Sequence, residues 1–413
     1  MINHTGAVNI HYWLMLLLAV LLPSGFYKLG GILVAILFLS WLFLVKGFRE
    51  IRKADTPVLL SISFFLIILV GFVYTNDISN QIQYTSRKLA FLIIPLVFIG
   101  FTPGVEQLNK IKKYFVYATL IFILIADLYA LADYLYTGEI KVFLSKSNHN
   151  KFTYYGLTRV FSKWHPTYVS LFLNTALIFI YEFYYHKKNY IIWLGLSLFA
   201  ILNILLLTSF IGIVSLLFLT ALFVYKLLSK NSVVLIMVSA VLVLTIGFLY
   251  VYNPLNYSKI NKFKKTEIKI TDRKVERNVL NLRLAKWKTS LQVIAAHPVF
   301  GVTNGDYKEE LYQQYLKNDF RYCASKRYSS HNQYLYTATS NGLIGFLLLL
   351  GILIVPFFRK GNIKGLFPFL GIMSIYFLTE DVLARQQGVV FFIFFYILLT
   401  RNKIPDAGVS NEQ

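Results

Sequence analysis

Residues 332–357 read NQYLYTATSNGLIGFLLLLGILIVPF, an apolar run without a charged side chain. A helix rises about 1.5 Å per residue, so roughly 17–25 residues cross a hydrocarbon layer about 30 Å thick. Lipid offers no hydrogen-bond partner to the backbone, and a helix satisfies its own N–H and C=O groups. The run therefore predicts a membrane-spanning helix.

The same pattern recurs along the rest of the chain. Apolar runs bounded by charge, Pro or Asn predict further helices at approximately 10–27, 29–46, 57–75, 89–102, 114–135, 166–185, 190–207, 209–228, 233–251, 364–380 and 387–400. The predicted fold class is an all-α, polytopic integral membrane protein with about 12 transmembrane helices. The runs at 89–102 and 387–400 are short, and only Thr208 and Ser209 divide the pair within 190–228, so a count of ten or eleven also fits.

Composition narrows the possible classes. Of 413 residues, 57% are apolar and 15% charged, which excludes a disordered chain, a collagen-like fibre and an ordinary water-soluble globule. The net charge of +22 suits contact with anionic membrane lipids or an anionic substrate. The basic residues form no recognisable nucleic-acid module, so we expect no nucleic-acid partner. Cys323 is the single cysteine, and no tight ligand spacing is present, so we expect no disulfide, metal or cofactor.

The distribution of Lys and Arg orients the helices. Short cytoplasmic connections are enriched in these residues, and a cytoplasmic N-terminus puts a basic cluster in every internal connection. The prediction is cytoplasmic N- and C-termini with external connections at 76–88, 136–165 and 252–331. The chain then divides into 1–251 with nine helices and short loops, 252–331 as one large periplasmic loop, and 332–413 with three helices and a short cytoplasmic tail.

An amphipathic helix is predicted near 279–296 within the large loop. Its apolar side chains recur every three or four residues, at Leu280, Leu284, Trp287, Leu291 and Ile294. Pro298 and Gly301 follow as helix-ending signals. Arg283, Lys286 and Lys288 lie on or beside the flanks of the stripe. We therefore expect a helix in the membrane interface, with Trp287 in the apolar layer and the cations at headgroup depth.

Three ordered motifs surround this loop. Arg283 and Trp287 are followed by HPVFGVTNGDY at 297–307 and by HNQYLYTATSNGLIG at 331–345. This set resembles the signature of the O-antigen ligase and polymerase superfamily, which includes bacterial O-linked oligosaccharyltransferases. The hydrophobic layout is similar as well, with one large loop before the last three helices.

The resemblance implies a GT-C-like membrane glycosyltransferase of the bacterial inner membrane. Its donor would be a glycan on undecaprenyl pyrophosphate, and its acceptor a glycan or lipid A-core. The histidine of the family corresponds to His331, the loop arginine to Arg283 and a second arginine to Arg87. The sequence departs from the family at Phe210, where many members have an arginine, so Arg159 or Lys163 would have to substitute for it.

The chemistry of these residue types fits that assignment. Arginine stays protonated and binds phosphate oxygens bidentately, so Arg87 and Arg283 suit a pyrophosphate leaving group. Histidine has a suitable pKa for a base, and His331 would activate the acceptor hydroxyl in one inverting displacement. Further substrate-binding candidates share a place in the external connections: Arg159, Lys163, His165, Trp287, Arg321 and Asn332.

Two other groups of residues carry expectations. His331, Ala338, Gly342 and Gly345 fall on one face of a continuous helix, where small side chains allow close approach. Glu380, Asp381 and Arg385 lie on the same external side as His331 and are expected to pair with one another rather than contact substrate.

Three alternatives remain open at this point. A polymerase would use the same donor with a growing glycan as acceptor. A transporter or flippase for lipid-linked oligosaccharides would also need many helices and a basic cavity, although the cations here gather in external loops rather than at mid-helix. A non-catalytic assembly or sensory protein would use the long loop only for binding.

Overall fold

A computed structural model of the chain describes residues 4–45, 54–137, 164–185, 189–228, 270–271, 274–275, 279–359 and 365–401. The predicted helix 233–251 lies outside these residues. Within them the chain is helical apart from one short antiparallel ladder, in which β1 (Ile270–Thr271) pairs with β2 (Lys274–Val275).

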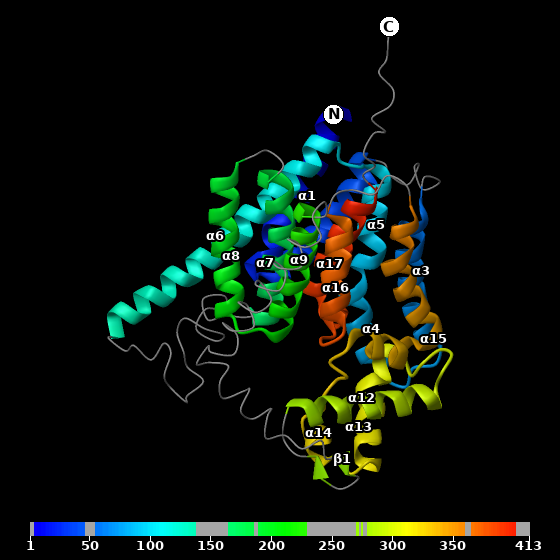
Figure 1. The fold of residues 1–413 in the computed structure, drawn as a ribbon. Coiled ribbons are helices and arrows are strands. Elements are labelled where there is room, and N and C mark those ends of the chain that lie inside the picture. The colour runs from blue at the N-terminus through cyan, green and yellow to red at the C-terminus, as the bar shows by residue number, and fades with distance from the viewer. Residues whose placement is uncertain are drawn as a thin grey trace.

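The helices form an upright bundle with a smaller group of helices across one end (Figure 1). The bundle consists of α1 (His4–Leu21), α2 (Tyr27–Leu39), α3 (Thr56–Val70), α4 (Ile78–Lys88), α5 (Ala90–Gly100), α6 (Val105–Thr137), α7 (Pro166–Ile180), α8 (Tyr190–Leu206), α9 (Phe210–Leu228), α15 (Gln333–Ile354), α16 (Leu366–Phe377) and α17 (Gln386–Arg401). The group across its end, here called the outer module, consists of α12 (Val279–Ala296), α13 (Thr303–Lys317) and α14 (Arg321–Ser325).

Helices lie where the apolar runs predict them throughout the described residues. Four of these described stretches are long and apolar enough to cross a membrane, namely Thr56–Val73, Ile78–Gly100, Val105–Asp133 and Gln333–Phe358. The run 190–228 is two helices, because Thr208 takes a left-handed φ of 49° and ends the first. Most of the external connection expected at 76–88 is helical, because α4 begins at Ile78, where the Asp77 carboxylate caps it by accepting from Asn80 N at 2.9 Å.

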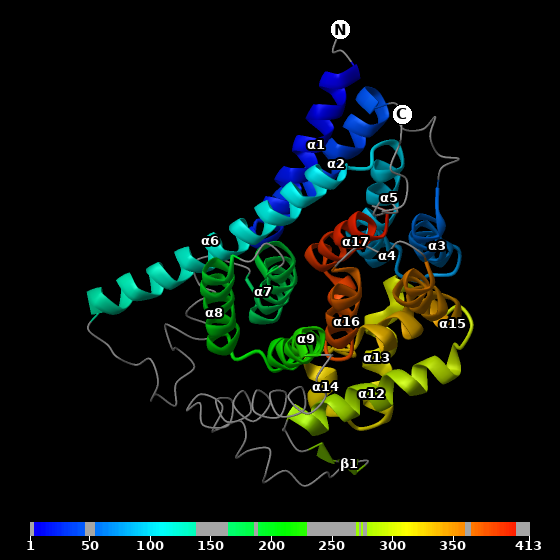
Figure 2. The same cartoon turned by 45° about the horizontal axis from the view of Figure 1, so that its top comes forward.

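Helix α17 occupies the centre of the bundle. Its residues from Gln387 to Leu399 are all buried. Phe391 and Phe395 make tilted or edge-to-face contacts with rings from other helices, including Phe115 and Phe172, at centroid distances of 4.7–6.1 Å. A helix that is apolar on every side packs best when it is surrounded, which explains its central place. In Figure 2, α6 projects beyond the bundle at its C-terminal end.

Polar side chains within the bundle have partners in neighbouring helices. Lys112 of α6 donates to both carboxylate oxygens of Glu182 at 3.0 and 3.1 Å. Asn203 of α8 donates to the Asp127 carboxylate of α6 at 3.1 Å. Such pairs reduce the cost of placing polar groups away from water.

The outer module has a small core of its own. Tyr307, Leu311, Tyr315 and Cys323 are buried in it, together with Tyr336 from α15. Helix α12 covers the predicted range 279–296. It buries its small and polar side, including Ala285, Thr289 and Ser290, and leaves Leu291 of the apolar stripe exposed.

Helix α15 is broken at Gly342, where φ is 63° and ψ is −164°. The segment before α13 fills the break, because Leu343 N donates to Pro298 O at 2.8 Å. In return, Val302 N donates to Thr339 O at 2.9 Å. The continuous face expected for His331, Ala338, Gly342 and Gly345 is therefore wrong, and the close approach that glycine permits is to a loop backbone.

We expect Gly342→Ala to destabilise the protein strongly, by about 2 kcal/mol or more, because a Cβ would meet the Val299 carbonyl in a backbone conformation that L-residues avoid. The thermal unfolding midpoint in detergent is the measurement. Gly195→Ala is the matched control, since open space surrounds that position within α8, and it should be neutral or stabilising. Equal midpoints for the two variants would contradict the role of the break.

Candidate functional site

His331 lies at the entrance to α15, beside the junction between α16 and α17. Its Nδ1 is 3.6 Å from Oε2 of Glu380, and both side chains are partly exposed. The backbone at His331 is left-handed, with φ of 47°. A non-glycine residue in this conformation needs its neighbours to hold it there.

Both residues next to His331 are anchored. Tyr307 of α13 donates its hydroxyl to Ser330 Oγ at 3.1 Å and accepts from Ser330 N at 2.9 Å. Asn332 caps α15 by accepting from Leu335 N at 3.1 Å, and its amide donates to Leu378 O at 3.1 Å. The histidine is therefore fixed to the outer module on one side and to the end of α16 on the other.

Charges from several segments converge on Glu380. Burial raises the pKa of its carboxyl, but contact with His331 and the charges of His331, His165 and Arg283 outweigh burial and hold that pKa below its ordinary value. Burial also raises the pKa of the neighbouring Asp381, which the charge of His331 opposes. The fold thus brings together His165 before α7, Arg283 of α12 and His331 before α15.

Lys286 joins this group from the same helix as Arg283. Its ammonium lies over the Tyr328 ring at 4.2 Å, and the Tyr328 and His331 rings meet edge to face at 6.1 Å. Burial lowers the pKa of Lys286, while the charges of Asp381 and Glu380 raise it. The side chain of Lys286, expected beside the flank of the apolar stripe at headgroup depth, is buried and packs inside the outer module.

Arg87 lies in the last turn of α4, with its guanidinium 4.9 Å from the centre of the Tyr84 ring. The next residue, Lys88, is buried and donates to Asn304 Oδ1 and, at 3.4 Å, to the Tyr336 hydroxyl. The amide of Asn304 donates to Asn341 Oδ1 at 2.8 Å. These bonds connect α4, α13 and α15 beneath the site.

The start of α13 is also attached to the turn between α3 and α4. Asp306 accepts from the backbone N–H groups of Asn76 and Asp77, each at 2.9 Å. Gly305 N donates to the Gln81 side chain at 2.7 Å. The NGDY motif at 304–307 therefore fixes the outer module to the bundle and, through Tyr307, fixes the loop that carries His331.

The remaining sequence candidates lie apart from this cluster or outside the described residues. Arg159 and Lys163 are outside them. Arg321 is exposed and pairs with Asp319 at 2.7 Å, Trp287 is partly buried on α12, and Phe210 is exposed at the start of α9.

Mutual pairing of Glu380, Asp381 and Arg385 is not what the structure shows. Glu380 contacts His331, and the Arg385 guanidinium lies 5.8 Å from the centre of the Tyr168 ring.

Among the described residues, no three His, Cys, Asp or Glu side chains gather as a set of metal ligands.

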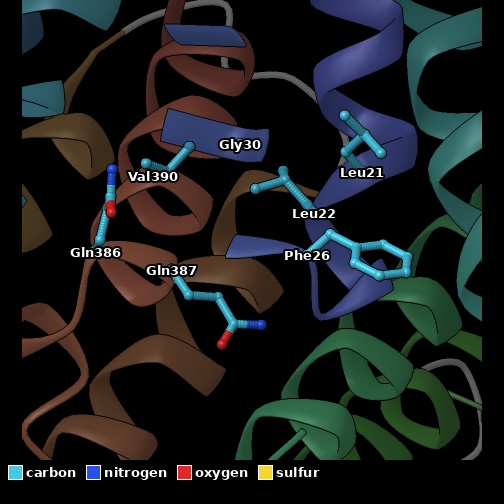
Figure 3. Close-up of a pocket in the computed structure, with 7 residues that line it drawn as sticks. All are labelled: Leu21, Leu22, Phe26, Gly30, Gln386, Gln387 and Val390. Atoms are coloured by element: carbon cyan, nitrogen blue, oxygen red, sulfur yellow. The ribbon is translucent and has the colours of Figure 1, made fainter. Parts of the chain in front are cut away.

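A small pocket of about 20 Å³, partly open to its surroundings, lies between the start of α17 and the turn after α1 (Figure 3). Apolar residues and two amides line it: Leu21, Leu22, Phe26, Gly30, Gln386, Gln387 and Val390. The segment before α7 is attached to the turn after α1, because Trp164 Nε1 donates to Pro23 O at 2.9 Å.

Sequence reasoning names Glu380 and Lys286 without their neighbours in the site and does not identify Lys88. No local pattern pairs Glu380 with a histidine 49 positions away. Hydropathy assigns lysine to a surface, so it does not predict the burial of Lys88 and Lys286. The NGDY motif was a usable signal, since its Asp and Tyr make bonds that no apolar pattern requires.

Comparison with known proteins supports the resemblance noted from the motifs. Residues 167–350 match the O-antigen ligase family. This part of the chain holds Arg283 and His331, while Arg87, His165 and Glu380 lie outside it. The chain is also 23% identical, over 94% of its length and 96% of the relative, to an uncharacterized protein of Haemophilus influenzae (strain ATCC 51907 / DSM 11121 / KW20 / Rd). The match covers 184 of the 413 residues.

We expect acid to destabilise the protein through His165. Its Nδ1 accepts from Thr167 N at 3.3 Å at the start of α7, and burial lowers the pKa of the imidazole. A pKa below the unfolded value means that the native state binds fewer protons, so stability falls as pH drops through about 6.5. Asparagine caps helices without titrating. His165→Asn should therefore reduce the fall in the thermal unfolding midpoint between about pH 7.5 and about pH 5.5. His297→Asn, at an exposed histidine, should behave like wild type. The same dependence of the midpoint on pH in all three proteins would contradict the role of His165.

Loss of the Tyr307 hydroxyl should leave Ser330 N buried without its partner. We expect Tyr307→Phe to lower the free energy of unfolding by about 1–3 kcal/mol. Tyr315→Phe is the control, because the equally buried Tyr315 hydroxyl has no hydrogen-bond partner among the described residues. Thermal unfolding in detergent compares the two, and the idea fails if Tyr315→Phe costs as much.

Proposed function

We propose that this protein is an O-antigen ligase-type glycosyltransferase. It moves a glycan from undecaprenyl pyrophosphate to a sugar hydroxyl of lipid A-core at the periplasmic face of the bacterial inner membrane. The proposal includes about 12 membrane helices, cytoplasmic termini and a periplasmic outer module. The observation that carries it is the convergence of Arg283, His331 and Glu380, because the first two lie within the O-antigen ligase family domain.

The arginines serve the leaving group. As the bond between the sugar C1 and the pyrophosphate oxygen breaks, negative charge grows on that oxygen, and fixed cations stabilise it more than they stabilise the ground state. Arg283 lies in the charged cluster and is the first candidate to bind the pyrophosphate. Arg87 is half-buried beside Tyr84 and is the second.

His331 serves the acceptor. With Nδ1 facing the Glu380 carboxylate, Nε2 is left to take the proton of the attacking hydroxyl. The hydroxyl oxygen forms the new bond to C1 as the bond to the pyrophosphate breaks, which inverts the configuration at C1. The carboxylate orients the imidazole and stabilises the imidazolium that forms.

The positions of the charges favour chemistry at one face over transport through the bundle. The cluster lies at the outer end, whereas three charged side chains within the bundle have partners: Lys112 pairs with Glu182, and Asp127 accepts from Asn203. A transporter pathway would need ionisable groups available near the middle of the bundle.

Glycan profiling tests the proposal. A deletion strain is complemented with wild type, Arg283→Ala, His331→Ala or Lys317→Ala, and free lipid-linked glycan is separated from glycan on lipid A. We expect each of the first two substitutions to reduce transfer about 100-fold or more and to leave lipid-linked chains accumulated. Lys317→Ala, which removes an exposed cation of the outer module, should act like wild type. Short single-unit glycans would instead identify a polymerase, and unchanged profiles would remove the catalytic assignment.

Glu380→Gln extends the same experiment. If the carboxylate acts only through the histidine, it should lower transfer in the wild-type background and add no further loss in the His331→Ala background. Additive losses would mean that Glu380 has a separate role.

A further inference from the structure

Five apolar side chains lie uncovered where the outer module meets the bundle. Three come from the end of α3 and the turn after it, and two from the segment between α12 and α13. Their exposed fractions are 36% for Phe72, 86% for Val73, 41% for Tyr74, 51% for Val299 and 49% for Phe300. The two segments touch, because the Tyr74 hydroxyl donates to Phe300 O at 2.8 Å. We call these five residues the apolar shelf.

The apolar shelf continues the surface of two helices that are long and apolar enough to cross a membrane. Leu66 and Val70 of α3 are exposed below it, as are Leu343 and Leu347 of α15 on the other side. Helices α3 and α15 pack against each other, and Leu343 N binds Pro298 O directly before Val299. The uncovered surface therefore passes from the two helices onto the shelf through groups that are bonded to one another.

The course of α12 fits the same boundary. It runs crosswise to α3 and α15, as Figure 1 shows, and leads into Val299 and Phe300. Its small and polar side faces α13 and α15, while Leu291 on its apolar stripe is exposed. A helix with this division of side chains lies at a membrane surface with its apolar side toward the acyl chains.

We propose that the apolar shelf is immersed in the lipid leaflet next to the outer module, so that the membrane itself is its partner. An aqueous position would leave a contiguous apolar patch in water beside the lipid-facing surface of α3 and α15.

The proposal is independent of the enzymatic activity, and its test measures only depth. In a Cys323→Ala background, single cysteines at Val73, Val299 and Phe300 carry an environment-sensitive nitrobenzoxadiazole label, and the protein is placed in phosphatidylcholine and phosphatidylglycerol vesicles. Leu66→Cys, exposed on the middle of α3, calibrates a lipid position. Lys308→Cys, exposed on α13, calibrates an aqueous one.

We expect all three shelf labels to lose about half or more of their emission when phospholipid brominated on the acyl chain near the headgroup is included, and to resist aqueous iodide. The Lys308 label should show the opposite behaviour. Iodide access equal to that of the Lys308 label would overturn the proposal. Resistance to iodide without quenching by brominated lipid would overturn it as well, in favour of a protein partner such as a second copy. Neither the iodide result nor the brominated-lipid result depends on whether the protein has transfer activity.

Discussion

The fold depends on the hydrogen bonds that the backbone of α15 makes where this helix is broken at Gly342. Residues on either side of Gly342 leave N–H and C=O groups that lipid cannot pair, and the segment from Pro298 to Val302 supplies both kinds of partner. A loop that enters a helix in this way cannot move without exposing those groups. The outer module is consequently fixed to the bundle. The residues that it carries keep a constant position relative to α15, the helix that follows His331.

The site is assembled from segments that are distant in the chain, and each is held by a different device. Asp306 fixes α13 to the turn before α4, Tyr307 fixes the loop at Ser330, and Asn332 fixes the start of α15 to the end of α16. Glu380 then meets His331 from the far side. Only part of this arrangement lies within the O-antigen ligase family domain, since α4, His165 and Glu380 are contributed by flanking regions.

Hydropathy predicted most of the bundle because membrane helices are decided by local composition. It failed where polar residues form a helix at the membrane boundary, as in α4, whose start depends on a cap at Asp77. It also failed at Gly342, because a broken helix and a continuous one have the same apolar content. The site was predictable where sequence motifs mark it, as they do at Arg283 and His331. The neighbours of Glu380 and Lys286 could not be predicted, because only tertiary packing brings them together.

The bonds that Asp306 makes have an evolutionary consequence. In the turn before α4, Asp306 accepts from the Thr75 hydroxyl at 3.3 Å and from the backbone N–H groups of Asn76 and Asp77, which every residue type except proline presents alike. Position 76 can therefore change its side chain without loosening this attachment, whereas the carboxylate at 306 cannot, and Asp77 is needed separately as the cap of α4. An attachment through backbone groups tolerates divergence in the turn before α4. Distant homologues should therefore be recognised by the acidic residue of the NGDY motif rather than by the sequence of that turn.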